Sequence, residues 1–136
     1  MFETFDHTAD IGLRVSAATL EELFVDAARG LTSLLVENVD DVRPTQTETV
    51  QLTGSDVDYL LFDWLNELLF RFEMGQLLCC EFDVRFSDQG LEATVRGETW
   101  DRSRHRLAHE VKAITYHGLS VQKTEAGWQT ELILDI

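Results

Sequence analysis

The sequence has 136 residues, of which 44% are hydrophobic and 26% are charged, with 1 proline. This composition excludes a disordered tail, a collagen-like rod and a disulfide-stabilised miniprotein, and it predicts a single compact domain over residues 1–136. The formal net charge of −14 argues against direct binding to a nucleic-acid backbone, because neutralising phosphates requires clustered lysine and arginine. An acidic surface favours metal ions or basic proteins as partners, and it also promotes solubility.

The cysteines and the lengths of the apolar runs indicate in which cellular compartment the protein works. Cys79 and Cys80 are adjacent, which fits neither a disulfide framework nor a zinc-binding spacing, so we interpret them as reduced thiols. The first residues contain no basic segment followed by an apolar stretch, and no apolar run approaches the ~18 residues of a membrane span. We therefore expect a cytoplasmic protein that is not anchored in a membrane.

The first elements in chain order are a strand and a helix. Residues 11–17 alternate between apolar and polar side chains, which predicts a half-buried strand. Apolar side chains then recur at helical spacing over residues 20–35. Thr19 is the expected N-cap of this helix, and Glu22 lies at the position that closes a capping box.

A second strand and helix follow. Residues 48–53 alternate again and predict a strand. A wide apolar stripe predicts an amphipathic helix over residues 56–74, with Ser55 as its N-cap. Gly75 is the expected C-terminal stop of this helix.

The second half of the sequence predicts mainly antiparallel sheet. Residues 80–87 and 91–97 flank one turn signal, and residues 119–124 and 128–135 flank another. Residues 101–117 are ambiguous, because their pattern suits either a strand or a helical turn. The predicted fold class is α+β, with antiparallel sheets packed against two main amphipathic helices.

Carboxylates near both ends of the chain are candidate metal ligands. Asp135 interrupts an apolar strand, and the α-carboxylate of Ile136 follows it directly. Asp10, with His7 three residues before it, precedes the first predicted strand. If an N-terminal and a C-terminal strand pair, three carboxylates converge, and an oxygen-only site suits Ca²⁺, Mg²⁺ or Mn²⁺. The alternative is a solvated terminus, with Asp10 accepting backbone amides in a polar loop.

A second group of polar residues lies between the two predicted hairpins. Glu110 and Lys112 share a face if this segment is a strand, and Tyr116 joins them. Lys112 could balance the carboxylates or bind a phosphate as a point charge, or it could form an ordinary salt bridge. His105 and His109 would share a helix face, but they lack a third ligand, so we assign no zinc site.

Several blocks of the sequence resemble the archease family, and together they span nearly the whole chain. In order, these blocks are His7-Thr8-Ala9-Asp10-Ile11-Gly12, Asp63-Trp64-Leu65-Asn66-Glu67-Leu68-Leu69, Arg96-Gly97-Glu98, Arg104-His105, Glu110-Val111-Lys112-Ala113, Thr115-Tyr116-His117-Gly118-Leu119 and Ile133-Leu134-Asp135-Ile136. His109 is the one visible departure from the family's pattern.

The resemblance implies a non-catalytic activator of an RtcB-type RNA ligase, which promotes guanylylation and turnover of the ligase in tRNA splicing or RNA repair. By motif, Asp10, Asp135 and the carboxylate of Ile136 would bind a divalent metal ion, and Lys112 would act in activation. We name His7 and Glu110, together with Lys112, as further candidate residues that function in activation. The resemblance also implies that RNA is bound by the ligase.

Two other functions stay open on the sequence. A small metal-dependent phosphohydrolase could use the same carboxylates, with His7 as general base. A chaperone-like binding module would need no metal ion.

Overall fold

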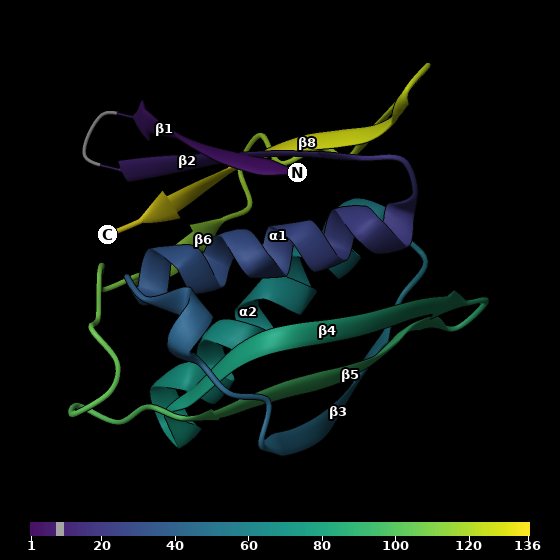
Figure 1. Cartoon of the computed structure of the whole chain (residues 1–136). Helices are drawn as coiled ribbons and strands as arrows, with labels where there is room; N and C mark the ends of the chain where they lie inside the picture. The colour runs from purple at the N-terminus through teal and green to yellow at the C-terminus, as the bar shows by residue number, and fades with distance from the viewer. Residues whose placement is uncertain (8–9) are drawn as a thin grey trace.

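The computed structural model describes residues 1–7 and 10–136. In this part of the chain, two α-helices lie between two antiparallel sheets (Figure 1). The helices are α1 (Leu20–Leu35) and α2 (Val57–Gly75), with a short 3₁₀ helix, η1 (Val39–Asp41), after α1. The strands are β1 (Phe2–His7), β2 (Asp10–Ala17), β3 (Gln46–Thr53), β4 (Leu77–Ser87), β5 (Gly90–Thr99), β6 (Ala113–Thr115), β7 (Gln122–Thr124) and β8 (Gly127–Asp135). This architecture confirms the predicted α+β class.

The first sheet brings the two ends of the chain together. Its strand order is β1-β2-β8-β6, and β7 also pairs with β8. Strands β2 and β8 are antiparallel, in a register that runs from Asp10 opposite Asp135 to Ala17 opposite Trp128. The last strand in the sequence is therefore an interior strand of this sheet.

The second sheet has the order β3-β5-β4. The long β4–β5 hairpin, which the sequence predicts, turns at Asp88 and Gln89. A β-bulge shifts the register of β4 between Cys79 and Glu81. The bulge lies where the burial pattern of the strand changes, from three consecutive buried residues, Leu77–Cys79, to alternation from Cys80 onward.

The helix ends agree with the sequence in one case and differ in two. Thr19 caps α1 as predicted, since its hydroxyl oxygen accepts from the Glu22 N–H at 3.2 Å. Ser55 was the wrong choice for α2, because the Asp56 carboxylate accepts from the N–H groups of Asp58 and Tyr59 instead. The helix includes Gly75, and Gln76 adopts the left-handed conformation with φ of 58°.

The core fills the space between the two sheets. Leu13 of β2 and Leu132 of β8 face Phe24 of α1 and Trp64 of α2, all with exposed fractions of 1% or less. The Trp64 indole donates to the Phe24 carbonyl at 2.9 Å, which ties the two helices together. Burial of these side chains fixes which face of β2 and β8 points away from the helices.

The ambiguous segment 101–117 is mostly irregular. Only Ala113–Thr115 forms a strand within it, and this strand, β6, pairs with the end of β8. His105 and His109 do not lie on a helix.

Candidate functional site

An acidic corner lies where β2, β8 and β6 meet, and we define it by Asp10, Asp135 and Ile136. Asp10 and Asp135 are directly opposite each other in the β2–β8 register. Ala113 lies opposite Asp135 on the other side, and His7 lies opposite Asp10 in the backbone register of β1. The N-terminal and C-terminal strands therefore pair, as the convergence of the three carboxylates requires.

The pairing geometry brings the side chains of Asp10 and Asp135 close enough to contact the same ion. Residues directly opposite in an antiparallel pair have Cβ atoms about 4.5–5.5 Å apart, and their side chains lie on the same face. Leu13 and Leu134 point into the core, so Asp10 and Asp135 lie on the face of the sheet away from the helices. Asp135 is exposed, and Asp10 and Ile136 are half-buried. Two like charges placed opposite each other are unfavourable, which makes this corner suited to a cation.

Lys112 is attached to this corner through its backbone. Its N–H donates to the Asp135 carbonyl at 2.8 Å, while its side chain is exposed. Glu110 is also exposed, and the side chain of Val111 between them is buried. Tyr116 does not share their face, because its ring stacks on Tyr59 of α2.

Part of the first motif lies outside the described structure. Thr8 and Ala9 are outside the described residues, as is the side chain of His7. Among the residues that are described, no three histidine, cysteine, aspartate or glutamate side chains form a metal-binding group. The acidic corner contains two such side chains, and the third candidate ligand is the main-chain carboxylate of Ile136.

An aromatic ring covers the glycine of the first motif. A Cβ atom at Gly12 would lie 2.2 Å from the ring of Phe5, so the ring occupies the space that a side chain would need. The Arg14 guanidinium lies over the same ring, 4.8 Å from its centroid. Sequence reasoning missed this packing, although the glycine in a strand was a signal of a close approach.

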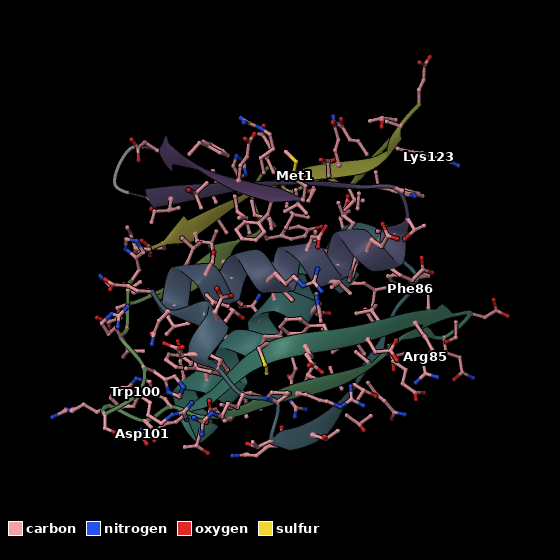
Figure 2. All side chains as sticks on the ribbon, viewed as in Figure 1. Met1, Arg85, Phe86, Trp100, Asp101 and Lys123 are labelled. Atoms are coloured by element: carbon pink, nitrogen blue, oxygen red, sulfur yellow. The ribbon has the colours of Figure 1, made fainter. Side chains whose placement is uncertain are left out.

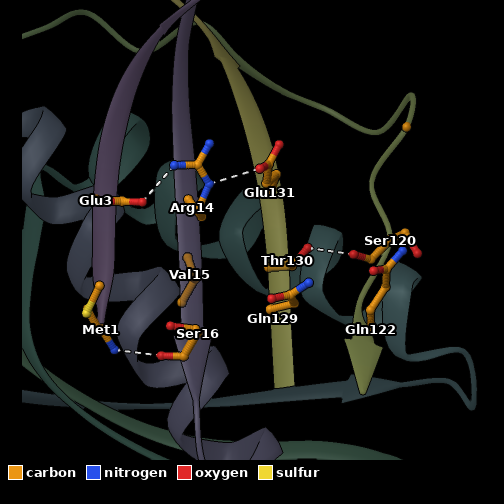
Figure 3. A pocket seen from close by; sticks show the side chains of 11 residues that line it. Met1, Glu3, Arg14, Val15, Ser16, Ser120, Gln122, Gln129, Thr130 and Glu131 are labelled. Carbon is orange, nitrogen blue, oxygen red and sulfur yellow. Dashed lines mark hydrogen bonds and ion pairs between the residues drawn. The ribbon is translucent and has the colours of Figure 1, made fainter. Parts of the chain in front are cut away.

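A hollow of about 500 Å³ lies on the same outer face, farther along the sheet (Figure 3). Arg14 bridges Glu3 at 2.7 Å and Glu131 at 2.9 Å across three strands, and these hydrogen bonds raise the pKa of its guanidinium. One arginine therefore offsets part of the negative charge that the two glutamates bring to the hollow. None of the sequence-predicted site residues lines it.

Glu98 is the centre of a buried polar network that the sequence analysis did not single out. Its carboxylate accepts from the Arg43 N–H at 2.6 Å and from the Arg104 guanidinium. The Asp101 N–H donates to Nδ1 of His105 at 2.9 Å, so Nε2 carries the proton and donates to Glu98 at 3.1 Å. Arg104, assisted by these other donors and opposed by burial, lowers the pKa of Glu98 to about 2.

This network accounts for His105 without a metal ion. Both ring nitrogens of His105 have partners, and the residue is 3% exposed, whereas His109 is exposed. The two cysteines are free, and burial raises the pKa of the Cys79 thiol to about 12, which opposes formation of the reactive thiolate.

With this geometry in place, comparisons with known proteins decide the family. The model of the archease protein family (MTH1598/TM1083) matches residues 2–136. The chain belongs to the archease family. Protein archease of Methanopyrus kandleri is 37% identical over 139 residues, which cover 99% of both chains. Protein archease of Pyrococcus abyssi is 36% identical over 140 residues, which cover 99% of this chain and 98% of the relative.

Two solved structures share the archease fold. The solution structure of Methanobacterium thermoautotrophicum protein 1598 superposes with a TM-score of 0.84 at 32% identity, covering 99% of this chain and 98% of the other. The crystal structure from Thermotoga maritima, described as an archease and possible chaperone, has a TM-score of 0.67 at 21% identity. It covers 100% of this chain and 98% of its own, and at this identity it shows the fold alone. No helix in residues 1–7 and 10–136 has the length and apolarity needed to cross a bilayer.

Proposed function

We propose that this archease is a non-catalytic, metal-binding activator of an RtcB-type RNA ligase, and that it acts in the cytoplasm in tRNA splicing or RNA repair. Membership of the archease family supports the general part of this proposal. The observation that carries the finer proposal is the register of β2 and β8, which sets Asp10 opposite Asp135 beside Ile136.

The donor set of the acidic corner fits a divalent cation such as Ca²⁺, Mg²⁺ or Mn²⁺. The two aspartates and the α-carboxylate of Ile136 offer only hard oxygen ligands, and the exposure of Asp135 leaves a route for entry. When bound, such an ion would supply positive charge that can face the phosphates of a nucleotide.

Lys112 is the residue that we propose to work beside these ligands. The hydrogen bond from its N–H to the Asp135 carbonyl fixes the start of its side chain next to the corner. Its ammonium group can then bind a phosphate as a point charge. Glu110 and His7 are further candidates for orienting groups around this position. The net charge of −14 supports contact with a basic ligase and leaves RNA binding to that partner.

The test is single-turnover guanylylation of a purified RtcB-type ligase with GTP and Mn²⁺. We expect acceleration by the wild-type archease and loss of acceleration in Asp135→Asn and Lys112→Ala. Lys123→Ala is the matched control, because Lys123 is the only other lysine. It contacts Trp128, at the end of β8 far from the C-terminus (Figures 1 and 2). No acceleration by the wild type, or full acceleration by both Asp10→Ala and Lys112→Ala, would refute the proposal.

A metal-free, chaperone-like module is the second candidate, because the Thermotoga maritima archease is described as a possible chaperone. Calorimetric titration with Ca²⁺, Mg²⁺ and Mn²⁺ separates the two functions. Binding that is lost in Asp135→Asn supports the metal-dependent activator, whereas no binding of any of the three ions supports the module.

A further inference from the structure

The outward face of α2 carries exposed apolar side chains. Tyr59 is 52% exposed, Phe70 is 56% exposed and Met74 is 72% exposed, and Phe62 between them is half-buried. Their helical spacing places them on one side of α2, opposite the face that packs against the core. We call these four residues, together with Tyr116, the α2 stripe. Single exposed apolar residues are ordinary, but two groups of them on one side of one helix, Tyr59 with Phe62 and Phe70 with Met74, indicate an interaction surface.

The N-terminal half of the stripe is held in a fixed arrangement. The rings of Tyr59 and Tyr116 stack with centroids 4.6 Å apart and planes 19° apart. Phe62 meets the Tyr116 ring edge-on at 5.2 Å. The Asp58 carboxylate accepts from the Val121 N–H at 2.8 Å, which anchors the chain that follows Tyr116 onto the helix. An ordered aromatic surface loses little side-chain entropy when a partner covers it.

The charges around the stripe indicate which partner fits it. Asp63 and Glu73 are exposed on the same side of α2. Arg71 is the only basic residue in the sequence of this helix, and it is paired with Glu67 and Glu48. A second copy of this chain would bring two acidic helices together, each in a molecule of charge −14, which is unfavourable. A partner surface with apolar side chains flanked by lysine or arginine complements both the apolar side chains of the stripe and the negative charges around it.

We propose that the α2 stripe docks a basic surface of the RNA ligase that presents apolar side chains. This inference rests on the proposed function. It holds that the affinity for the ligase comes from the α2 stripe, which is a different surface from the acidic corner. The two are connected by β6, because Ala113 lies opposite Asp135 and Tyr116 follows three residues later. At the rise of a strand, this places Tyr116, at the N-terminal end of the stripe, roughly 10 Å along the chain from the corner. The corner lies on the outer face of the first sheet and the stripe lies on its helix side, so a ligase that contacts both extends around the β6 edge of this sheet.

The experiment is a titration of ligase guanylylation with archease, which separates the half-activating concentration from the maximal rate. The test variant is Phe70→Ser with Met74→Ser, and Tyr59→Ala is the second variant. We expect the half-activating concentration to rise at least about tenfold in the double variant, at an unchanged maximal rate, since apolar anchors dominate interface energies. Leu107→Ser is the matched control, because Leu107 is 44% exposed and lies outside the stripe. Equal urea midpoints for all variants establish that they are folded.

The outcomes distinguish this inference from the proposed function. If the wild type fails to accelerate the ligase, the proposed function is refuted and the docking surface with it. If the wild type accelerates and the stripe variants titrate identically to it, the docking inference alone is wrong. A fall in the maximal rate at an unchanged half-activating concentration also overturns it. Sedimentation that shows a wild-type dimer, dissociated by the double variant, would assign the stripe to a second copy instead.

Discussion

Glu98 in β5 and Asp135 in β8 are both carboxylates in strands, but their surroundings are opposite. Glu98 is 8% exposed and receives hydrogen bonds from Arg43, Arg104 and His105. Asp135 is exposed and faces the carboxylate-bearing Asp10 across the β2–β8 pair. A carboxylate surrounded by donors stabilises the fold, whereas a carboxylate set against another one adds repulsion unless a cation is bound.

The comparison separates residues that maintain the fold from residues that are available for function. Glu98, Arg104 and His105 are residues of the first kind, because their polar groups have partners within the chain. We assign the acidic corner to the second kind, because Asp135 is exposed and lies opposite a second carboxylate-bearing residue, Asp10. The following predictions test this division, from the largest expected effect to the smallest.

Replacing Glu98 should destabilise the protein more than any change at the corner. Glu98→Gln removes the charge that Arg104 faces in a nearly buried site, and we expect a loss of about 3 kcal/mol in the free energy of unfolding. Urea denaturation measures it. Glu92→Gln on the same strand is the control, because Glu92 is exposed and should change stability by less than about 0.5 kcal/mol. Equal effects of the two substitutions would contradict the division.

The stabilisation from Glu98 should depend on pH in a defined direction. The Arg104 guanidinium lowers the pKa of Glu98 from 4.5 to about 2 in the folded protein. The unfolded state therefore takes up a proton first, so the stabilisation is complete above pH 4.5 and is lost as the pH falls towards 2. The difference in unfolding free energy between wild type and Glu98→Gln should therefore shrink as the pH falls from about 4.5 to about 2. A constant difference would show that Glu98 has an ordinary pKa.

Extending the chain beyond Ile136 should abolish stabilisation by a divalent cation. The extension moves the α-carboxylate away from Asp10 and Asp135, which removes one of the three proposed ligands. At an ion concentration of about 100 times Kd, we expect the wild type to gain roughly 2.7 kcal/mol and the extended form to gain much less. Thermal unfolding with and without Mn²⁺ measures this gain. The same extension placed before Met1 is the control, and equal gains in both forms would exclude the three-carboxylate site.

The smallest expected effect is a gain in stability without metal. Asp135→Asn removes one of two like charges that lie opposite each other, so the metal-free protein should be more stable by about 0.2–1 kcal/mol. Urea denaturation in the presence of a chelator measures this change. Asp83→Asn serves as the control, because Asp83 is exposed and lies opposite Thr94. A loss of stability in Asp135→Asn would mean that Asp10 and Asp135 do not repel each other.

Local signals in the sequence predicted the helices and hairpins well, because those signals act over a few residues. Thr19 capped α1 as expected, while Ser55 was wrong because Asp56 next to it is an equally good acceptor. Strand β1 was not predicted, since Phe5 breaks the alternation of the strand by lying on the outer face over Gly12.

The candidate site was harder to predict than the elements. The pairing of Asp10 with Asp135 joins positions from opposite ends of the chain, and no local pattern encodes that register. The sequence alone made both residues candidate ligands on the condition that the two strands pair, and the resemblance to archease was needed to place them in one site. The partners of Glu98 were also invisible, because Arg43 contributes a backbone N–H from a distant turn.

The place of β8 in the first sheet has a consequence for how the chain is made. Gly127–Asp135 follows the other described strands of this sheet in the sequence, yet it lies between β2 and the strands β6 and β7. Until it is synthesised, β2 has an open edge and the two short strands have no partner in the sheet. Assembly of this sheet therefore waits until residues 127–135 are available, and nascent chains that stall before residue 127 expose an edge prone to aggregation.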